Sequence, residues 1–105
     1  MDRTQIPDLG RFAEPALLIL VSLTEGPKHG YAIAKDIETF AQRKLGPGTL
    51  YGAIARLEAA ELIQPLAGDA RRRPYRLTSA GAQALKADVG ALRRVAAVAA
   101  RRLAT

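Results

Sequence analysis

The chain has 105 residues, a length that suits one domain, and 49% of them are hydrophobic, which disfavours a disordered chain. It contains no Cys, so disulfides and thiolate metal sites are excluded. The formal net charge of +6 at pH 7 favours a polyanionic partner such as nucleic acid.

The beginning of the sequence has no apolar segment like that of a signal peptide. The longest apolar run, Ala16–Val21, is far too short to cross a bilayer. We therefore expect a soluble cytoplasmic protein without membrane association. We assign residues 1–14 to a polar N-terminal arm.

The first predicted helix runs from Pro15 to Thr24, because proline is well tolerated at the first helical turn. It is apolar on most sides, which is typical of a helix buried on two faces. One face would cover its own domain, and the other, with Leu18 and Ile19, would contact a partner subunit.

The second predicted helix spans about His29 to Gln42, after a Gly-Pro break. Its core face would carry Ile33, Ile37 and Phe40 at helical spacing, with Tyr31, Lys35 and Glu38 on the opposite face. His29 is open to two interpretations, a pH switch or metal ligand and a structural residue at a helix start. We favour the structural role, because a lone His without Cys makes a poor metal site.

The third predicted helix begins after Gly46, with Pro47 in its first turn, and ends near Ala60. Leu50, Ile54 and Leu57 form its core stripe. The opposite face carries small residues, which indicates close approach of a partner to the backbone: Gly48, Gly52, Ala55 and Ala59.

Three larger side chains flank this small-residue face: Thr49, Tyr51 and Arg56. Arg56 is the expected base reader, because arginine pairs bidentately with guanine. An ion pair on the helix surface is the alternative for Arg56, and inward packing is the alternative for Tyr51. The preceding Gly46–Thr49 loop lacks the Gly-Lys-Ser/Thr ending of a nucleotide-binding P-loop and follows no strand.

Two extended runs, 62–66 and 73–78, are separated by a turn-like segment at 67–70. Tyr75 and Leu77 share one face of the second run. The predicted hairpin carries basic residues at or near its tip, and we expect them to contact phosphates rather than to form only a flexible basic loop: Arg71, Arg72, Arg73 and Arg76.

The last predicted helix is capped by Thr78 or Ser79 and runs to about Leu103. Its apolar residues are spaced by four and three, as in a heptad seam: Leu85, Val89, Leu92, Ala96, Ala99 and Leu103. The seam could pack on its own domain, but a small winged helix needs little such cover. We therefore expect residues 79–105 to form a dimerisation helix.

The order of three helices, a basic hairpin and a long helix predicts a mostly α fold. The expected architecture is a winged helix-turn-helix over residues 15–78, with the hairpin as a small β wing. Three segments also resemble the PadR family of transcriptional regulators, named after the phenolic acid decarboxylase regulators. They are the apolar helix followed by Gly26-Pro27-Lys28-His29-Gly30-Tyr31, the Gly48-Thr49-Leu50-Tyr51 segment through Arg56-Leu57-Glu58, and Arg71–Gly81.

This resemblance implies a homodimer that binds a pseudo-palindromic operator in double-stranded DNA, most simply as a repressor. It implies that the C-terminal helix crosses to the partner's first helix, and that a small molecule or stress signal at the dimer interface releases the DNA. No Trp is present and the C-terminal segment is Ala-rich, so no flat aromatic pocket is evident. Glu61 departs from the resemblance, because the family usually has Gly there.

The hypothesis is therefore a sequence-specific DNA-binding regulator with no cofactor and no metal. The expected DNA contacts are Lys28, His29, Tyr31, Lys35, Gly48, Thr49, Tyr51, Gly52, Arg56, Arg71, Arg72, Arg73 and Arg76. The expected dimer contacts are Leu18, Ile19, Leu85, Val89, Leu92, Ala96, Ala99 and Leu103. A winged-helix module that binds proteins is the alternative. An enzyme is disfavoured, because one His and no paired carboxylates offer no catalytic constellation.

Overall fold

The computed structural model describes residues 7–69 and 72–104, with side chains from Glu14 onward. It confirms the mostly α fold with a small antiparallel sheet. In chain order the elements are α1 (Pro7–Ser22), the 3₁₀ helix η2 (Leu23–Glu25), β1 (Lys28–His29), α2 (Gly30–Ala41), α3 (Pro47–Ala59), β2 (Ile63–Pro65), β3 (Pro74–Leu77) and α4 (Ser79–Leu103). Across the described ranges, no helix combines the length and apolar character that a bilayer crossing would require.

Helix α1 begins at Pro7, so the predicted start at Pro15 was wrong. Pro15 lies inside the helix and is buried. A proline lacks the N–H group that a helix interior normally uses, so it is a stronger signal for a helix start than for an interior position. Of the predicted arm at 1–14, residues 1–6 lie outside the described residues and residues 7–14 are helical, so this part of the prediction was wrong.

The core lies where α1, α2 and α3 meet, and helical spacing predicted most of it. The predicted stripe of α3 and most of that of α2 are buried, and they form one core with residues of α1, η2, β2 and α4: Ile19, Leu20, Leu23, Ile33, Ile37, Leu50, Ala53, Ile54, Leu57, Ile63 and Leu85. Phe40 was expected in this core but is 43% exposed. It occupies the last turn of α2, beyond the buried residues Ile33 and Ile37 of the same helix.

The sheet has the order β1-β3-β2, with both pairs antiparallel. The β2–β3 hairpin matches the predicted one, with Ile63 opposite Leu77 and Pro65 opposite Tyr75. Strand β1 was not predicted. It has only two residues, Lys28 and His29, which pair with Tyr75 and Pro74. Two residues carry no readable periodicity, so only the pairing with a distant strand reveals it.

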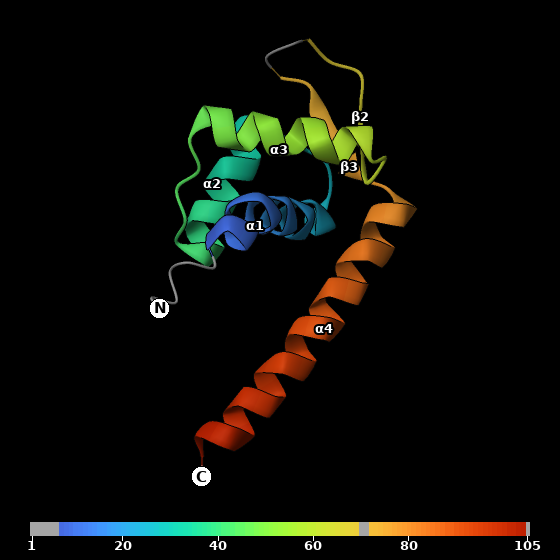
Figure 1. The fold of residues 1–105 in the computed structure, drawn as a ribbon. Coiled ribbons are helices and arrows are strands. Elements are labelled where there is room, and N and C mark those ends of the chain that lie inside the picture. Colours follow the sequence, from blue (N-terminus) through green and yellow to red (C-terminus); the bar gives the residue numbers. More distant parts are fainter. Residues whose placement is uncertain (1–6, 70–71, 105) are drawn as a thin grey trace.

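Helix α4 leaves the body of the domain as a projecting arm (Figure 1). The Thr78 hydroxyl caps it by accepting a hydrogen bond from the Gly81 N–H at 3.0 Å. Only Gly81 and Leu85 are buried along its 25 residues. The radius of gyration of 15.1 Å exceeds the roughly 13 Å expected for a compact chain of this length. The projecting helix therefore leaves a long, unpartnered surface.

Candidate nucleic-acid interface

The small-residue face of helix α3 is exposed to solvent, because the opposite side of the helix is buried in the core. Thr49, Tyr51 and Arg56 are exposed, and Gly52 is half-buried. A Cβ built on Gly52 would meet only the Arg56 Nη1 atom, at 3.6 Å. The Arg56 side chain therefore lies back over Gly52 toward the start of α3, as long helical side chains do. This arrangement places one guanidinium on an otherwise slim helix surface.

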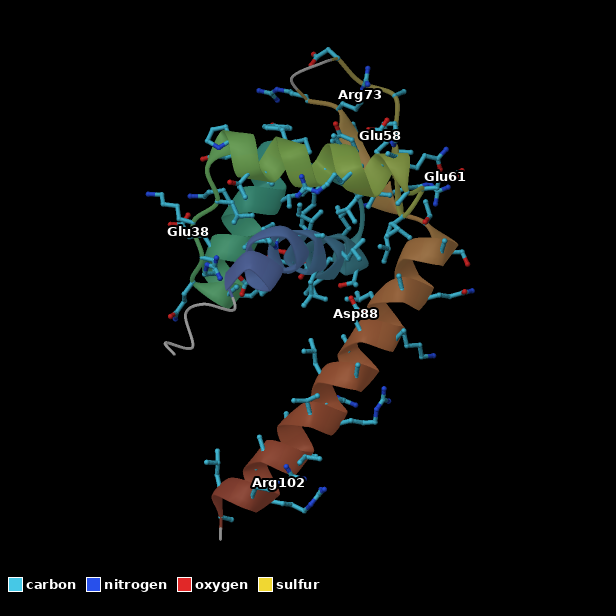
Figure 2. All side chains as sticks on the ribbon, viewed as in Figure 1. Glu38, Glu58, Glu61, Arg73, Asp88 and Arg102 are labelled. Atoms are coloured by element: carbon cyan, nitrogen blue, oxygen red, sulfur yellow. The ribbon has the colours of Figure 1, made fainter. Side chains whose placement is uncertain are left out.

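The β2–β3 hairpin stands beside α3 (Figure 1). Arg72 and Arg73 are exposed near its tip, while Arg71 lies outside the described residues. The tip is shaped by Asp69, whose carbonyl and carboxylate oxygens accept hydrogen bonds from the Arg72 N–H at 3.2 and 2.9 Å. Figure 2 shows Arg73 on the hairpin, above α3 and Glu58. The hairpin tip thus places cationic side chains beside α3, on the side of that helix where Glu58 lies.

Arg76 is an exposed residue of β3, the middle strand of the sheet. Its guanidinium donates to the Gln64 side-chain oxygen across the strand pair, and to the Leu77 carbonyl at 3.4 Å. These bonds hold Arg76 close to the sheet, whereas among residues 7–69 and 72–104 no hydrogen bond ties the Arg72 or Arg73 side chain. Arg76 therefore has less freedom than the tip residues to reach a phosphate.

The start of α2 adds aromatic and basic side chains. His29 is the N-cap, and its Nδ1 accepts a hydrogen bond from the Ala32 N–H at 3.4 Å. Its ring stacks on the ring of Tyr31 at a centroid distance of 6.5 Å. This geometry supports the structural interpretation of His29. No group of three or more His, Asp or Glu side chains in the described part of the chain is placed to hold a metal ion.

Tyr51 links α3 to the start of α2. A Cβ on Gly30 would fall 2.4 Å from the Tyr51 hydroxyl oxygen, so the phenol ring packs directly over that glycine. Tyr51 is still 47% exposed. A groove of about 560 Å³ adjoins it between α2 and α3, lined in part by Tyr31, Lys35 and Lys44. Lys44 adds a second basic side chain to the lining of this groove.

Lys28 does not belong to this surface. Its side chain is 17% exposed, and its ammonium donates to Glu25 Oε1 at 3.0 Å and to the Ser22 carbonyl. The same nitrogen lies 3.8 Å from Asp36 Oδ2, and the buried Ser22 hydroxyl donates to that carboxylate at 2.8 Å. Lys28 therefore joins η2 to α2 from within, and this placement argues against its expected role as a DNA contact.

The Tyr75 phenol sits where the sheet meets α3, and its pKa is raised. Burial is the main cause, because it disfavours the charged phenolate. The Glu58 carboxylate and Tyr51 add to the rise, while the nearby Arg73 guanidinium opposes it. The hairpin and α3 are thus electrostatically coupled through Tyr75, a link that the sequence did not reveal.

The expected dimer residues divide between core and surface. Ile19 is fully buried in its own core and Leu85 is 8% exposed, so Ile19 has no surface to offer a partner. The distal seam residues are open, with Leu92 54% and Leu103 85% exposed. Val95, which the seam pattern missed, is 67% exposed. It borders a groove of about 620 Å³ on α4 with Val98, Ala99 and Leu103.

Comparison with known proteins decides the family. Residues 19–87, more than half of the chain, match the sequence profile described as "Transcriptional regulator PadR-like family". The chain belongs to the PadR-like family. Its PadR-like segment contains α2, α3, the whole sheet and the start of α4, so every element of the surface described above except the distal part of α4 lies within it.

Two solved structures agree with this PadR-like assignment. A transcriptional regulator from Clostridium thermocellum is 28% identical, with a TM-score of 0.75, and the match covers 90% of this chain and 95% of that one. A PadR family transcription regulator from Clostridium difficile is also 28% identical, with a TM-score of 0.75, over 87% of this chain and 99% of the other. The winged-helix architecture is therefore confirmed, and these relatives are transcriptional regulators rather than enzymes.

A further relative of this PadR-like chain is an uncharacterized 37.1 kDa protein in transposon Tn4556 of Streptomyces fradiae. The two are 45% identical over 85 residues, which is 81% of this chain. The chain spans about a quarter of the length of that relative.

Proposed function

We propose that this PadR-like regulator is a homodimeric, cytoplasmic repressor that binds a pseudo-palindromic DNA operator. The observation that carries the proposal is the position of the basic hairpin beside α3 (Figure 1), a helix whose exposed side is lined mainly by small residues. The major groove is wide enough for an α-helix, and small side chains on α3 let the backbone approach the base edges. Arg56 then reads a base, while Arg72 and Arg73 contact flanking phosphates.

The start of α2 extends the contact surface along the DNA backbone. Tyr31 and Lys35 are exposed next to the groove between α2 and α3, and Tyr51 holds the two helices together over Gly30. His29 contributes mainly by capping α2. Contacts of this kind add affinity without reading sequence, because every duplex presents the same phosphates.

The second copy binds along α4. The exposed apolar residues Val89, Leu92, Val95 and Leu103 lie on the projecting helix. An apolar face of this length on a free helix is unfavourable in water, and another copy of the same helix has matching chemistry. The half-buried Leu18 on α1 lies on a helix that already contacts α4 within the chain. An apolar effector would bind against this face between the copies and release the DNA.

The test is selection of duplexes from a random pool by the purified full chain, followed by footprinting. The expected result is an inverted repeat with half-site centres about 34 Å apart, one turn of the double helix. Affinity should fall steeply as salt rises, because phosphate contacts release counterions. A protein-interaction module is the competing function, and absence of salt-sensitive binding to any duplex would favour it.

A further inference from the structure

The end of α3 is tied to the start of α4 by a compact joint. The Thr78 hydroxyl donates to the Glu61 carbonyl at 2.8 Å, and the Thr78 N–H donates to the Leu62 carbonyl at 3.1 Å. The same hydroxyl caps α4 at Gly81. Thr78 therefore connects the turn that ends α3 to the first turn of α4.

Gly81 is the point of closest approach in this joint. A Cβ at this position would lie 2.0 Å from the Leu62 carbonyl oxygen and 2.9 Å from Leu77 Cδ1. The nearest obstacle is backbone, so no flexible side chain can move aside to make room. Only glycine allows α4 to pack this tightly against the segment that leaves α3.

Because α4 is long, a small change in its angle at the joint produces a large displacement of its distal end. Only Gly81 and Leu85 are buried along α4, and the rest of the helix leaves the body (Figure 1). From Gly81 to Leu103 the helix extends about 33 Å, at 1.5 Å per residue. A tilt of about 10° at the joint therefore displaces the distal end by about 6 Å over that length. One base-pair step along DNA is about 3.4 Å.

We propose that Gly81 is a specificity-determining residue that sets the spacing between the two operator half-sites. This inference rests on the proposed homodimeric DNA binding. With two copies joined through their α4 helices, the angle at Gly81 determines how far apart the two α3 helices lie. The residue reads no base itself. It selects among operators by the number of base pairs between their halves.

The test compares Gly81→Ala with Gly90→Ala in the full chain. Both changes add one methyl group to a glycine of the same helix, but a Cβ on Gly90 meets only Arg94 Nη1, at 3.6 Å. Each variant is titrated against duplexes in which the half-site spacing is changed one base pair at a time. For Gly81→Ala, affinity at the wild-type spacing should fall about tenfold or more, with the optimum moved by at least one base pair. Gly90→Ala should keep the wild-type optimum.

A distance measurement tests the same idea without DNA. The chain has no Cys, so Ala59→Cys places one spin label per copy at the exposed end of α3. The label-to-label distance in the dimer should shift by several ångströms in Gly81→Ala and stay unchanged in Gly90→Ala. Circular dichroism checks that each variant is folded. If Gly81→Ala does not fold, Thr78→Val carries the test, because it removes both hydroxyl hydrogen bonds and should broaden the distance distribution.

The outcomes separate the two proposals. A dimer that binds no duplex contradicts the proposed function, while the label distance still reports on the joint. A folded Gly81→Ala dimer with wild-type distance and wild-type spacing preference overturns the role of Gly81 alone. If Thr78→Val is used in place of Gly81→Ala, a distance distribution equal to that of wild type also overturns the role of the joint.

Discussion

Glu61, in the turn that follows α3, has a backbone conformation that is unusual for a residue with a side chain. Glu61 has a φ of 61°, in the left-handed region where glycine is favoured. The Leu62 N–H donates to the Leu57 carbonyl, and the Glu61 N–H donates to the Glu58 carbonyl, both at 2.9 Å. This is the Schellman pattern, which usually places glycine where Glu61 stands. The departure from the family noted in the sequence is therefore a point of backbone strain.

Glu61→Gly should stabilise the fold by about 0.5–1 kcal/mol, because glycine adopts positive φ without a Cβ clash. Urea unfolding followed by circular dichroism measures the change. Glu61→Ala is the matched control, since it removes the charge and keeps the strain. Equal gains from both variants would show that charge, not conformation, is responsible.

Ionisation of the Tyr75 phenol should lower the stability of the fold at high pH. Its folded-state pKa is raised above the ordinary value, mainly by burial, so the fold favours the neutral phenol. This contribution is fully present below the unfolded pKa of about 10 and is lost as the pH rises through the raised folded value. Wild type should therefore lose stability relative to Tyr75→Phe above about pH 10. Parallel urea titrations of the two proteins measure the difference, and identical pH profiles would contradict it.

Arg56→Ala should weaken operator binding by about 1–3 kcal/mol and relax the preference at one base pair. The reason is loss of bidentate hydrogen bonding from the guanidinium that lies over Gly52. Arg56→Lys keeps the charge but not the planar fork, so it should lose the same preference. Competition binding against single-base operator variants is the measurement. A uniform loss on all sequences would make Arg56 a phosphate contact.

At the scale of elements, packing determines which side of α3 is exposed and where the hairpin lies. The buried stripe of α3 forces its small-residue face outward. The hairpin beside it owes its place to β3, which pairs with β2 on one edge and with β1 on the other. The two-residue strand β1 thus ties the hairpin to the start of α2.

Arg72→Ala tests the hairpin as a phosphate-contacting element. Affinity should fall to the same degree on operator and random DNA, and the slope of log K against log salt should decrease by about 1. Isothermal binding at several salt concentrations measures both. Lys86→Ala, an equal loss of charge on the exposed surface of α4, is the control and should leave the slope unchanged. A loss confined to the operator would make the hairpin a sequence reader.

At the scale of the whole molecule, the projecting α4 carries the surface that we propose for the second copy, away from the surface that we propose for DNA. Its apolar residues span a wider arc than a strict heptad seam, because Val95 and Val98 extend the face beyond the predicted line. In the proposed dimer, the second copy would therefore cover more of α4 than one narrow helix stripe.

Leu92→Asp should dissociate the dimer, because it places a charge in the middle of this apolar face without disturbing the monomer core. Analytical ultracentrifugation measures the change in mass. Ala97→Asp introduces the same charge on the exposed opposite side of α4 and should leave the dimer intact. Unchanged sedimentation of the Leu92 variant would place the dimer contact elsewhere.

The amino-acid sequence by itself determined the local elements of this protein. Helical spacing of apolar residues predicted two helices and the sides they bury, from Ile33 and Ile37 in one and from Leu50, Ile54 and Leu57 in the other. Pro47 and Thr78 predicted where α3 and α4 begin. These signals are local, since a helix is specified by residues three and four apart and by its own cap.

Only the tertiary structure decided what depends on distant residues. It placed Lys28 among Ser22, Glu25 and Asp36, paired β1 with β3, and brought Gly81 against the Leu62 carbonyl. Each of these contacts joins segments that are apart in the chain, and such contacts produce no repeating pattern in the sequence. They depend on how the helices and strands pack. The sequence therefore predicted the surface that we propose for DNA binding, while packing determined which of its basic residues are exposed and how closely α4 is joined to the domain.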